Sequence, residues 1–363
     1  MKLDAELRDA CRKGDVPQVT NLLEKPFDIN VGDNVGWNPF LLSCYGNHSS
    51  IVEALLKDKR INVNYQMSDG STALHVVCEF GKTKIFKLLI TDERVNVTLQ
   101  NNLGATPFYV ACASGYIETV KLLLNDPRVN INTPNHSGVT PLIVACQEGH
   151  KAIVELLLKD ERIEVNSETN EGMTAFIAAC ELHYFEIFKL LLNHNNIDVD
   201  SAMKDGRSAI FVSTQRGYLQ LVKWILANGK EINLKRKWNE NHQTVFHHAK
   251  SLIHEDRQEW ESKEEVKIRQ KNCRDIMRLL GSYLIDPIKT RIELRKDLVP
   301  PSQSILQFPF LLNLKSFFSL KKVQSAPPRN IQKELNSFVK NKMMHMIFDG
   351  SSSFILFFIY LNF

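Results

Sequence analysis

Cysteine is the residue type in this 363-residue chain whose chemistry and spacing are most informative. In the thiolate form it can attack a substrate or hold a metal ion. Five of the seven cysteines lie 34 residues apart, at Cys44, Cys78, Cys112, Cys146 and Cys180. A catalytic cysteine would be a single residue close to an orienting histidine, so five equivalent copies argue against catalysis. The interval indicates a stacked repeat in which each thiol is a small buried apolar group.

The other two cysteines need separate treatment. Cys11 lies 33 residues before Cys44, one fewer than the interval, and extends the series towards the N-terminus. Cys273 lies outside the series, in a charged segment or the last helix, and a surface thiol is the one chemical role left open for it. An odd number of cysteines, most of them in one repeat position, does not form a disulfide framework. This pattern favours a reducing intracellular compartment.

Histidines near the end of the repeats raise the question of a zinc site. His242, His247, His248 and His254 are close in sequence, but no cysteine pair with ligand spacing lies nearby. We therefore predict that the chain binds no metal. It also lacks a glycine-rich phosphate loop, a nucleophile elbow and a kinase signature, so we expect neither a cofactor nor an enzymatic activity.

Glycines recur at the same interval as the cysteines and divide each repeat into short elements. They are Gly36, Gly70, Gly104, Gly138, Gly172 and Gly206. In one unit, Thr106 is predicted to cap a first helix that begins at Pro107. Gly115 ends this helix, and a second helix follows at 117–124 with its apolar residues in one stripe. Because helices this short are marginal in water, each unit needs neighbours on both sides.

The units resemble ankyrin repeats. The run Thr-Pro-Phe/Leu-x-x-Ala-Cys occurs at 106–112 and 140–146, each time with a following glycine, and Thr72-Ala73-Leu74-His75 is similar. The Trp and Leu-Gly signature of tetratricopeptide repeats is missing. The resemblance covers about residues 1–290. It implies an all-α solenoid of helix-turn-helix units with β-turn fingers, an irregular helical cap and a loose C-terminal tail.

On this basis we divide the chain into four parts. A degenerate N-terminal unit is predicted at 1–35 and six ankyrin-like repeats at 36–242. An irregular unit at 243–296 carries a charged helical insertion near Glu255 to Lys271, with its second helix at Ile276–Leu280. The remaining residues, 297–363, are predicted to form a tail of low order that is basic and apolar.

Two departures from the ankyrin pattern concern its glycines. The helix-ending glycine is replaced by Asp-x-Arg at 58–60, 92–94 and 126–128, which adds one residue to the usual length of the unit. At the mid-repeat glycine, Asn47 and His183 substitute. Both residue types tolerate a positive φ better than most, so we expect the fold to be unchanged.

The tail accounts for the positive charge of the chain. The net charge is +4, and 297–363 contain seven Lys/Arg and three Asp/Glu, so the rest is close to neutral and lacks the basic face of a nucleic-acid binder. The apolar run at 354–363 is too short to span a bilayer as a helix. It is a membrane tether, a docking segment or a poorly ordered, aggregation-prone end, and we favour the last.

The resemblance implies a non-catalytic scaffold or adaptor that binds a partner protein. Ankyrin arrays bind through the finger tips and the inner face of the first helices, which here correspond to the residues that flank each unit's first glycine and the two that follow the cysteine position. These residues include Trp37, Tyr45, Ser71, Glu79, Phe80, Leu103, Val139, Gln147, Met173, Leu182, Arg207 and Arg216. Trp37, Tyr45 and Phe80 should form one patch across adjacent units, unless they are ordinary exposed apolar residues.

A second candidate is the basic run Lys235-Arg236-Lys237-Trp238, for which a solvated loop is the main alternative. We expect a cytoplasmic monomer with a protein partner, and we expect neither a nucleic-acid partner nor membrane association. Two other functions stay open: a membrane-associated adaptor tethered by the tail, and the regulatory fragment of a larger enzyme.

Overall fold

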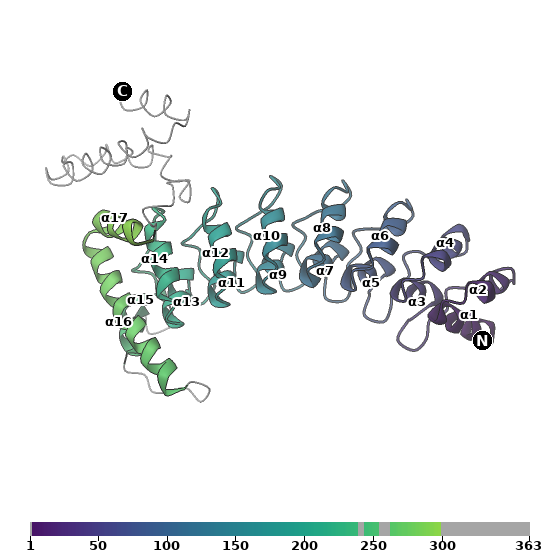
Figure 1. Cartoon of the computed structure of the whole chain (residues 1–363), viewed down its shortest axis with the longest axis horizontal. Helices are drawn as coiled ribbons and strands as arrows, with labels where there is room; N and C mark the ends of the chain where they lie inside the picture. Colours follow the sequence, from purple (N-terminus) through teal and green to yellow (C-terminus); the bar gives the residue numbers. More distant parts are fainter. Residues whose placement is uncertain (1, 239–242, 254–261, 299–363) are drawn as a thin grey trace, which may run out of the picture. The chain divides into compact units, whose positions relative to one another are not determined.

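Pairs of short helices follow one another along the chain. The computed structural model describes residues 2–238, 243–253 and 262–298. Figure 1 shows the pairs side by side in chain order, with the second helix of each regular pair above the first. The first helices are α1 (Lys2–Lys13), α3 (Pro39–Tyr45), α5 (Ala73–Glu79), α7 (Pro107–Ser114), α9 (Pro141–Gln147), α11 (Ala175–Glu181), α13 (Ala209–Gln215) and α15 (Val245–Leu252). The second helices are α2 (Val16–Leu23), α4 (Ser49–Lys57), α6 (Thr83–Ile90), α8 (Ile117–Leu124), α10 (Lys151–Leu157), α12 (Phe185–Leu192), α14 (Leu219–Ala227) and α16 (Lys263–Ile285).

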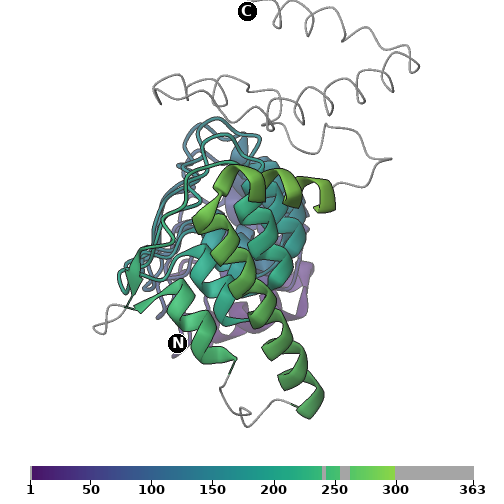
Figure 2. The same cartoon turned by 90° about the vertical axis from the view of Figure 1, so that its left-hand side faces the viewer.

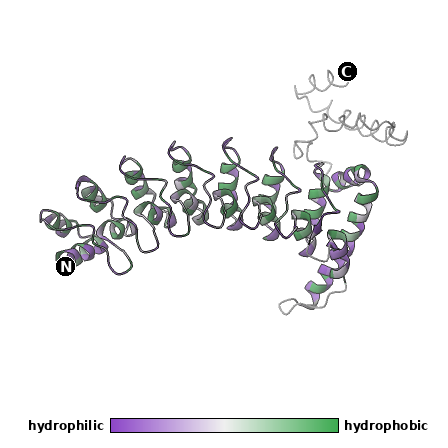
Figure 3. Ribbon diagram, turned by 180° about the vertical axis from the view of Figure 1, so that it is seen from behind, coloured by the Kyte–Doolittle hydropathy of each residue, from purple (hydrophilic) through white to green (hydrophobic). Residues whose placement is uncertain are grey.

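The core runs continuously through the array because the helices of each internal unit pack on those of the units before and after it. First helices pack on first helices, α5 on α7 and α7 on α9, and each also packs on its own second helix. The six cysteines of the series lie in this interface, and each has an exposed fraction of 0%. Their predicted role as small buried apolar groups is therefore confirmed. Figure 2 looks along the array, so that the units lie one behind another, and Figure 3 shows that the helices carry the hydrophobic residues of each unit.

The helix ends are set by the residues that the sequence suggested. The Thr106 and Thr140 side chains cap α7 and α9 by accepting backbone N–H bonds three residues on, and a proline opens each helix. Gly115 ends α7 in the left-handed region, with φ 81°. Asn47 and His183 adopt φ 59° and 57° at the mid-repeat position, as predicted.

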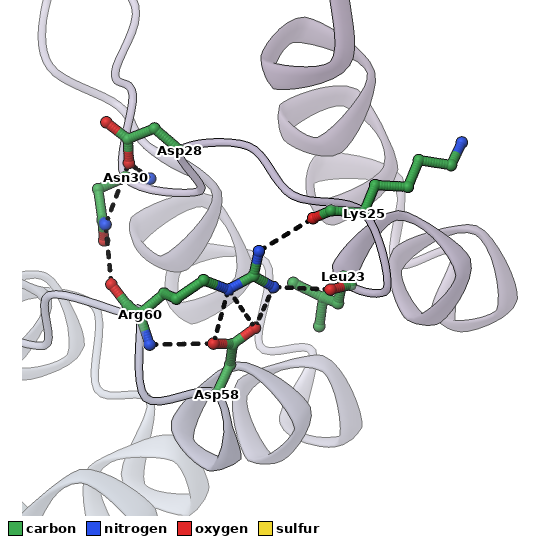
Figure 4. A network of polar contacts seen from close by, with 6 residues as sticks. All are labelled: Leu23, Lys25, Asp28, Asn30, Asp58 and Arg60. Carbon is green, nitrogen blue, oxygen red and sulfur yellow. Dashed lines mark hydrogen bonds and ion pairs between the residues drawn. The ribbon is translucent and has the colours of Figure 1, made fainter.

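In four units, an arginine in the loop after the second helix fixes the unit to the preceding one, as Figure 4 shows for Arg60. Asp58 accepts bonds from the backbone and the guanidinium of Arg60, which orients the arginine. The guanidinium then donates to the carbonyls of Lys25 and Leu23 at 2.9 and 2.6 Å. These carbonyls lie at the end of the preceding second helix, where no intrahelical donor is available. We call this Asp-x-Arg arrangement a latch.

The latch recurs in three further loops. Arg94 donates to the carbonyl of Leu56, Arg128 to that of Ile90 and Arg162 to that of Leu124. Each arginine is also paired with its own aspartate, two residues earlier, at 2.6 Å. From the sequence alone, the Asp-x-Arg motif was interpreted only as one extra residue in the unit. In the structure, its side chains make a repeated contact between units.

The C-terminal end is held differently. Lys230 reaches back to the carbonyl of Ile197 at 2.6 Å, in place of a latch arginine. The last helix, α17 (Pro287–Leu298), packs on α14 and supplies two more arginines. Arg291 donates to the carbonyl of Lys230, and Arg295 donates to those of Ala227 and Asn228. The end of the last regular second helix is thereby capped from a neighbouring element.

The irregular unit agrees with the sequence in outline. The expected second helix, Ile276–Leu280, lies within α16, which is 23 residues long. Cys273 is fully buried in α16, so the surface thiol considered for it is wrong; the apolar packing of α16 on α15 and α14 encloses it. Part of the charged insertion and residues 299–363 of the predicted tail lie outside the described residues. The division of the chain into four parts stays a prediction. In the described part of the chain, no helix has the length and apolar character needed to cross a membrane.

Candidate functional site

The fingers are turns whose shape is fixed by a side chain at their first position. Asp33 accepts N–H bonds from Val35 and Trp37 at 3.0 and 2.9 Å. Asn101 does the same with Leu103 and Ala105, both at 3.0 Å. Such local bonds restrict the turn to one conformation. The residues flanking each first glycine are therefore presented on a rigid support.

Neighbouring fingers are joined by backbone hydrogen bonds. The N–H of Asn102 donates to the carbonyl of Asp69 at 2.8 Å, and the N–H of His136 donates to that of Leu103 at 2.9 Å. Ser68, Asn170 and Lys204 repeat the contact in their own units. The five bonds form a ladder along the fingers, so their exposed side chains keep a constant relation to one another.

The end of each first helix presents a second set of side chains. Since the cysteine position is buried, the residues that follow it point away from the helix interface. In the second unit Tyr45 stands there with an exposed fraction of 47%, and in the next unit Phe80 has 39%. Corresponding positions in other units carry smaller or polar residues such as Ala113, Ser114 and Gln147. The inner helix ends therefore differ in character along the array.

Trp37, Tyr45 and Phe80 lie together, as their spacing predicted. The ring centroids of Trp37 and Tyr45 are 5.5 Å apart, and those of Tyr45 and Phe80 are 5.0 Å apart. Both pairs have edge-to-face geometry, which suits the charge distribution of aromatic rings. The Lys82 ammonium lies 6.0 Å from the Tyr45 ring centroid. We call Trp37, Tyr45 and Phe80 the aromatic patch.

The other expected binding residues are distributed along the array and are partly engaged. On the fingers, Leu103 is the most exposed, at 71%, whereas Val139, Met173 and Ser71 are half-buried. The Gln147 amide lies 3.7 Å from the Met173 sulfur. Arg207 is paired with Asp205 at 2.6 Å, and Arg216 lies 3.8 Å from Glu181. Glu79 and Leu182 are exposed beside the ends of their helices.

One residue of this surface was missed by the sequence. Tyr109 stands in α7 at the position that His75 occupies in α5, and its hydroxyl accepts a bond from the Asn135 amide at 3.3 Å. Burial raises the pKa of Tyr109, and the nearby Glu148 carboxylate adds to the effect. Tyr109 thus links a first helix to the next finger. The sequence carried no signal of this contact at Tyr109, two residues after the proline of Thr-Pro, because its partner lies in another unit.

The thiols are unsuited to nucleophilic or metal chemistry at neutral pH. Burial raises the pKa of Cys11 to about 11 and that of Cys180 to about 12. Burial also raises the pKa of Cys44, Cys78, Cys112 and Cys146. The thiolate that either chemistry requires is therefore scarce. Among the described residues, no group of His, Cys, Asp and Glu has the arrangement of a metal site.

His75 has a structural role in the first helix of its unit. Its Nε2 lies 3.0 Å from the carbonyl oxygen of Ala105, which can only accept, so Nε2 carries the proton. Its Nδ1 accordingly accepts from the backbone N–H of Thr72 at 3.1 Å. Burial lowers the pKa of His75. The histidine is held neutral by these contacts and closes the cap of α5.

Comparison with known proteins identifies the repeats. A family model described as ankyrin repeats (3 copies) matches residues 7–101, 77–169 and 161–236. The solved ankyrin repeat domain of Bcl-3, a unique member of the IkappaB protein family, is 22% identical over 61% of this chain and 97% of that chain, with a TM-score of 0.55. The ankyrin repeat protein EF0377 is 28% identical over 53% of this chain and 98% of its own, with a TM-score of 0.49. No curated protein matches the sequence. The likeness to Bcl-3 concerns the fold.

Proposed function

The chain belongs to the ankyrin-repeat family, and from this premise we propose that it binds a partner protein through the aromatic patch. Ankyrin repeats are generally protein-interaction modules, and the family is typically not enzymatic. The observation that carries the proposal is the contact of Trp37, Tyr45 and Phe80 across two units, although 47% of Tyr45 and 39% of Phe80 remain exposed.

Three properties of the patch favour binding over a purely structural role. Tryptophan and tyrosine are the types most enriched among the residues that dominate binding energy. The rings hold one another in place, so little side-chain entropy remains to be lost on binding. The fingers and helix ends that carry them are fixed by the Asp33 turn and by the packing of α3 on α5. A partner with an apolar side chain at its centre would fit this surface.

We further propose that this binding is non-catalytic, takes place inside the cell and involves a monomer. Seven free cysteines, all buried, support a reducing compartment. Raised thiol pKa values support the absence of cysteine catalysis.

The test is affinity purification of the full chain and two double variants, followed by mass spectrometry. Tyr45→Ala/Phe80→Ala removes the exposed part of the patch. Tyr116→Ala/Tyr184→Ala removes two rings of similar exposure, 40% and 37%, at the turn between the helices of other units. We expect partners to be lost with the first variant and retained with the second. Identical partner sets for all three proteins, with unchanged thermal unfolding, would reject the patch as the binding site.

A further inference from the structure

The ends of the first helices form one row along the array. In each unit, the two residues that follow the cysteine position stand at this end, and the first of them meets the second of the next unit. The ring centroids of Tyr45 and Phe80 are 5.0 Å apart. Farther along, the Arg216 guanidinium lies 3.8 Å from the Glu181 carboxylate in the same relation. Since the first helices between these contacts pack in series, the row is continuous. We call it the inner row, and it consists of Tyr45, Gly46, Glu79, Phe80, Ala113, Ser114, Gln147, Glu148, Glu181 and Leu182.

Two glutamates of the inner row stand near the aromatic patch without a cation opposite them. Glu79 directly precedes Phe80, and Glu148 stands two units further on, at the end of α9. Both glutamates are exposed. The contact between successive units places Glu79 opposite Ser114 and Glu148 opposite Ala113, and neither of these residues carries a charge. In the described part of the chain, no ion pair joins either glutamate to a lysine or an arginine.

The fingers beside the inner row add to its negative charge. Finger and row meet where Trp37 contacts Tyr45, and again where the Met173 sulfur lies 3.7 Å from the Gln147 amide. The fingers of the third to the sixth unit contain no lysine or arginine and two exposed carboxylates; they are 67–71 with Asp69, 101–105, 135–139, and 169–173 with Glu171. Over these units, neither the row nor the fingers supply a cation that would neutralise the glutamates.

Cations limit the acidic part of the row at both ends. Arg12, the residue after the cysteine of the first unit, is exposed. Lys82 lies in the turn before α6, with its ammonium 6.0 Å from a ring centroid of the aromatic patch. At the other end, Arg216 lies beside the last glutamate of the row. Beyond it, the last two residues of the basic run form β1 (Lys237–Trp238), which pairs antiparallel with β2 (Gln243–Thr244). A ligand that suits the acidic part is therefore short.

We propose that the partner segment at the aromatic patch is short, extended and basic, with an apolar side chain on the patch and Lys or Arg side chains opposite Glu79 and Glu148. This inference rests on the proposed function of the patch. Ammonium and guanidinium groups complement the carboxylates of the row, and they also interact favourably with the faces of aromatic rings. Because packed helices lie about 8–10 Å apart, the two glutamates are separated by about 20 Å, which an extended chain covers in about six residues. The partner should therefore carry two basic positions with about this spacing, the first of them next to its apolar residue.

The experiment begins with the selection of random peptides, displayed on phage, against the full chain at low salt. We expect the enriched peptides to combine a large apolar residue with several lysines or arginines. Selection against Glu79→Gln/Glu148→Gln should keep the apolar residue and lose the excess of basic residues. Selection against Tyr45→Ala/Phe80→Ala should enrich neither kind of residue.

The peptide most enriched by the full chain is then labelled, and its Kd is measured by fluorescence anisotropy at low and high salt. Glu53→Gln/Glu161→Gln is the control, since it makes the same change in net charge at exposed glutamates of α4 and of the loop after α10. We expect about tenfold weaker binding at low salt for Glu79→Gln/Glu148→Gln and less than about a twofold change for the control. High salt should reduce the difference between the two variants.

The outcomes separate this inference from the proposed function. Enriched peptides that are apolar but not basic would overturn the inference and leave the patch as a binding site. Equal losses in the two glutamine variants would also overturn it, because only net charge would then matter. Peptides that bind Tyr45→Ala/Phe80→Ala as tightly as the full chain would reject the patch itself, and the inference with it. No enrichment of any peptide would exclude a linear segment as the ligand.

Discussion

The loops after the second helices and the ends of the first helices differ in how their residues recur. The loops carry the same Asp-x-Arg latch in four units, ending at Arg60, Arg94, Arg128 and Arg162. The helix ends carry a different residue in almost every unit, from Tyr45 to Gln147 to Arg216. Both sets are at the surface, so exposure does not explain the difference.

What the side chains contact explains it. A latch arginine donates to backbone carbonyls of the preceding unit, and every unit has such carbonyls, so one residue type suits all positions. A residue at the end of a first helix is not required to reach a neighbouring backbone, so it is free to vary. Recurring surface residues therefore hold the array together, and varying ones are available for partners. Four sets of substitutions test this comparison, and they follow in order of their expected effect on the free energy of unfolding, the largest first.

The largest difference in the free energy of unfolding is expected between the substitution of a core phenylalanine and that of a phenylalanine in the aromatic patch. Phe176 is fully buried and stacks on Phe188, with ring centroids 5.3 Å apart, whereas Phe80 is 39% exposed. Phe176→Ala should lower the free energy of unfolding by about 3–5 kcal/mol, since it leaves a cavity. Phe80→Ala should lower it by less than about 1 kcal/mol. Denaturant unfolding measures both, and similar losses would show that the patch is part of the core.

A latch arginine and an inner arginine form the second pair. Arg128 pairs with Asp126 at 2.6 Å and donates to the carbonyls of Ile90 and Val95, whereas the guanidinium of Arg216 lies 3.8 Å from the carboxylate of Glu181. We expect Arg128→Ala to cost about 1–2 kcal/mol of unfolding free energy and Arg216→Ala less than about 0.5 kcal/mol.

Arg128→Lys sharpens the result. Lysine keeps the charge but lacks the planar fork that reaches the carboxylate and the carbonyls together, so it should restore less than half of the loss. Full recovery with lysine would mean that the latch is a simple charge pair. An equal cost at Arg216 would remove the distinction between the two surfaces.

The aspartate of the latch makes the third effect depend on pH. Hydrogen bonds and the charge of Arg128 lower the pKa of Asp126. When the pH falls below the ordinary pKa of aspartate, Asp126 takes up a proton in the unfolded chain but stays ionised in the folded chain. The contribution of Asp126 to the free energy of unfolding is therefore present at neutral pH and is lost as the pH falls through the lowered pKa. Asp126→Asn should therefore reduce stability at pH 7 and flatten its decline in acid, as followed by denaturant unfolding across the pH range. If the free energy of unfolding of the variant declined at low pH as it does in the original chain, Asp126 would be excluded as a cause of that decline.

The sequence predicted features that repeat, because each copy supplies independent support for the same position. The cysteine interval located the buried interface, and Asn47 and His183 were assigned a positive φ from the glycines of other units. The proximity of Trp37, Tyr45 and Phe80 also followed from the interval. The function of the latch did not follow, since Arg94 contacts the carbonyl of a residue 38 positions earlier and a backbone carbonyl carries no sequence signal.

The smallest effect concerns His75, a polar residue at a position that is buried in the first helices of other units too. The same place in other first helices holds Leu41, Ile143 or Ile177, so leucine fits there. In α5 the position holds a buried histidine whose pKa is lowered by burial. Its lowered pKa means that, as the pH falls below about 6.5, the unfolded chain gains a proton before the folded chain does. Stability is therefore lost over that window.

His75→Leu removes this loss without leaving the Ala105 carbonyl unpaired, because the N–H of Asn101 also donates to it, at 3.0 Å. We expect the variant to show a smaller fall in unfolding free energy between pH 7.5 and the acid side of the histidine range, measured by urea unfolding at each pH. A fall equal to that of the original chain would assign the pH dependence to other histidines. A buried polar side chain at a repeated position, such as His75, would then belong to the residues that hold the array together and not to the varying residues that are available for partners.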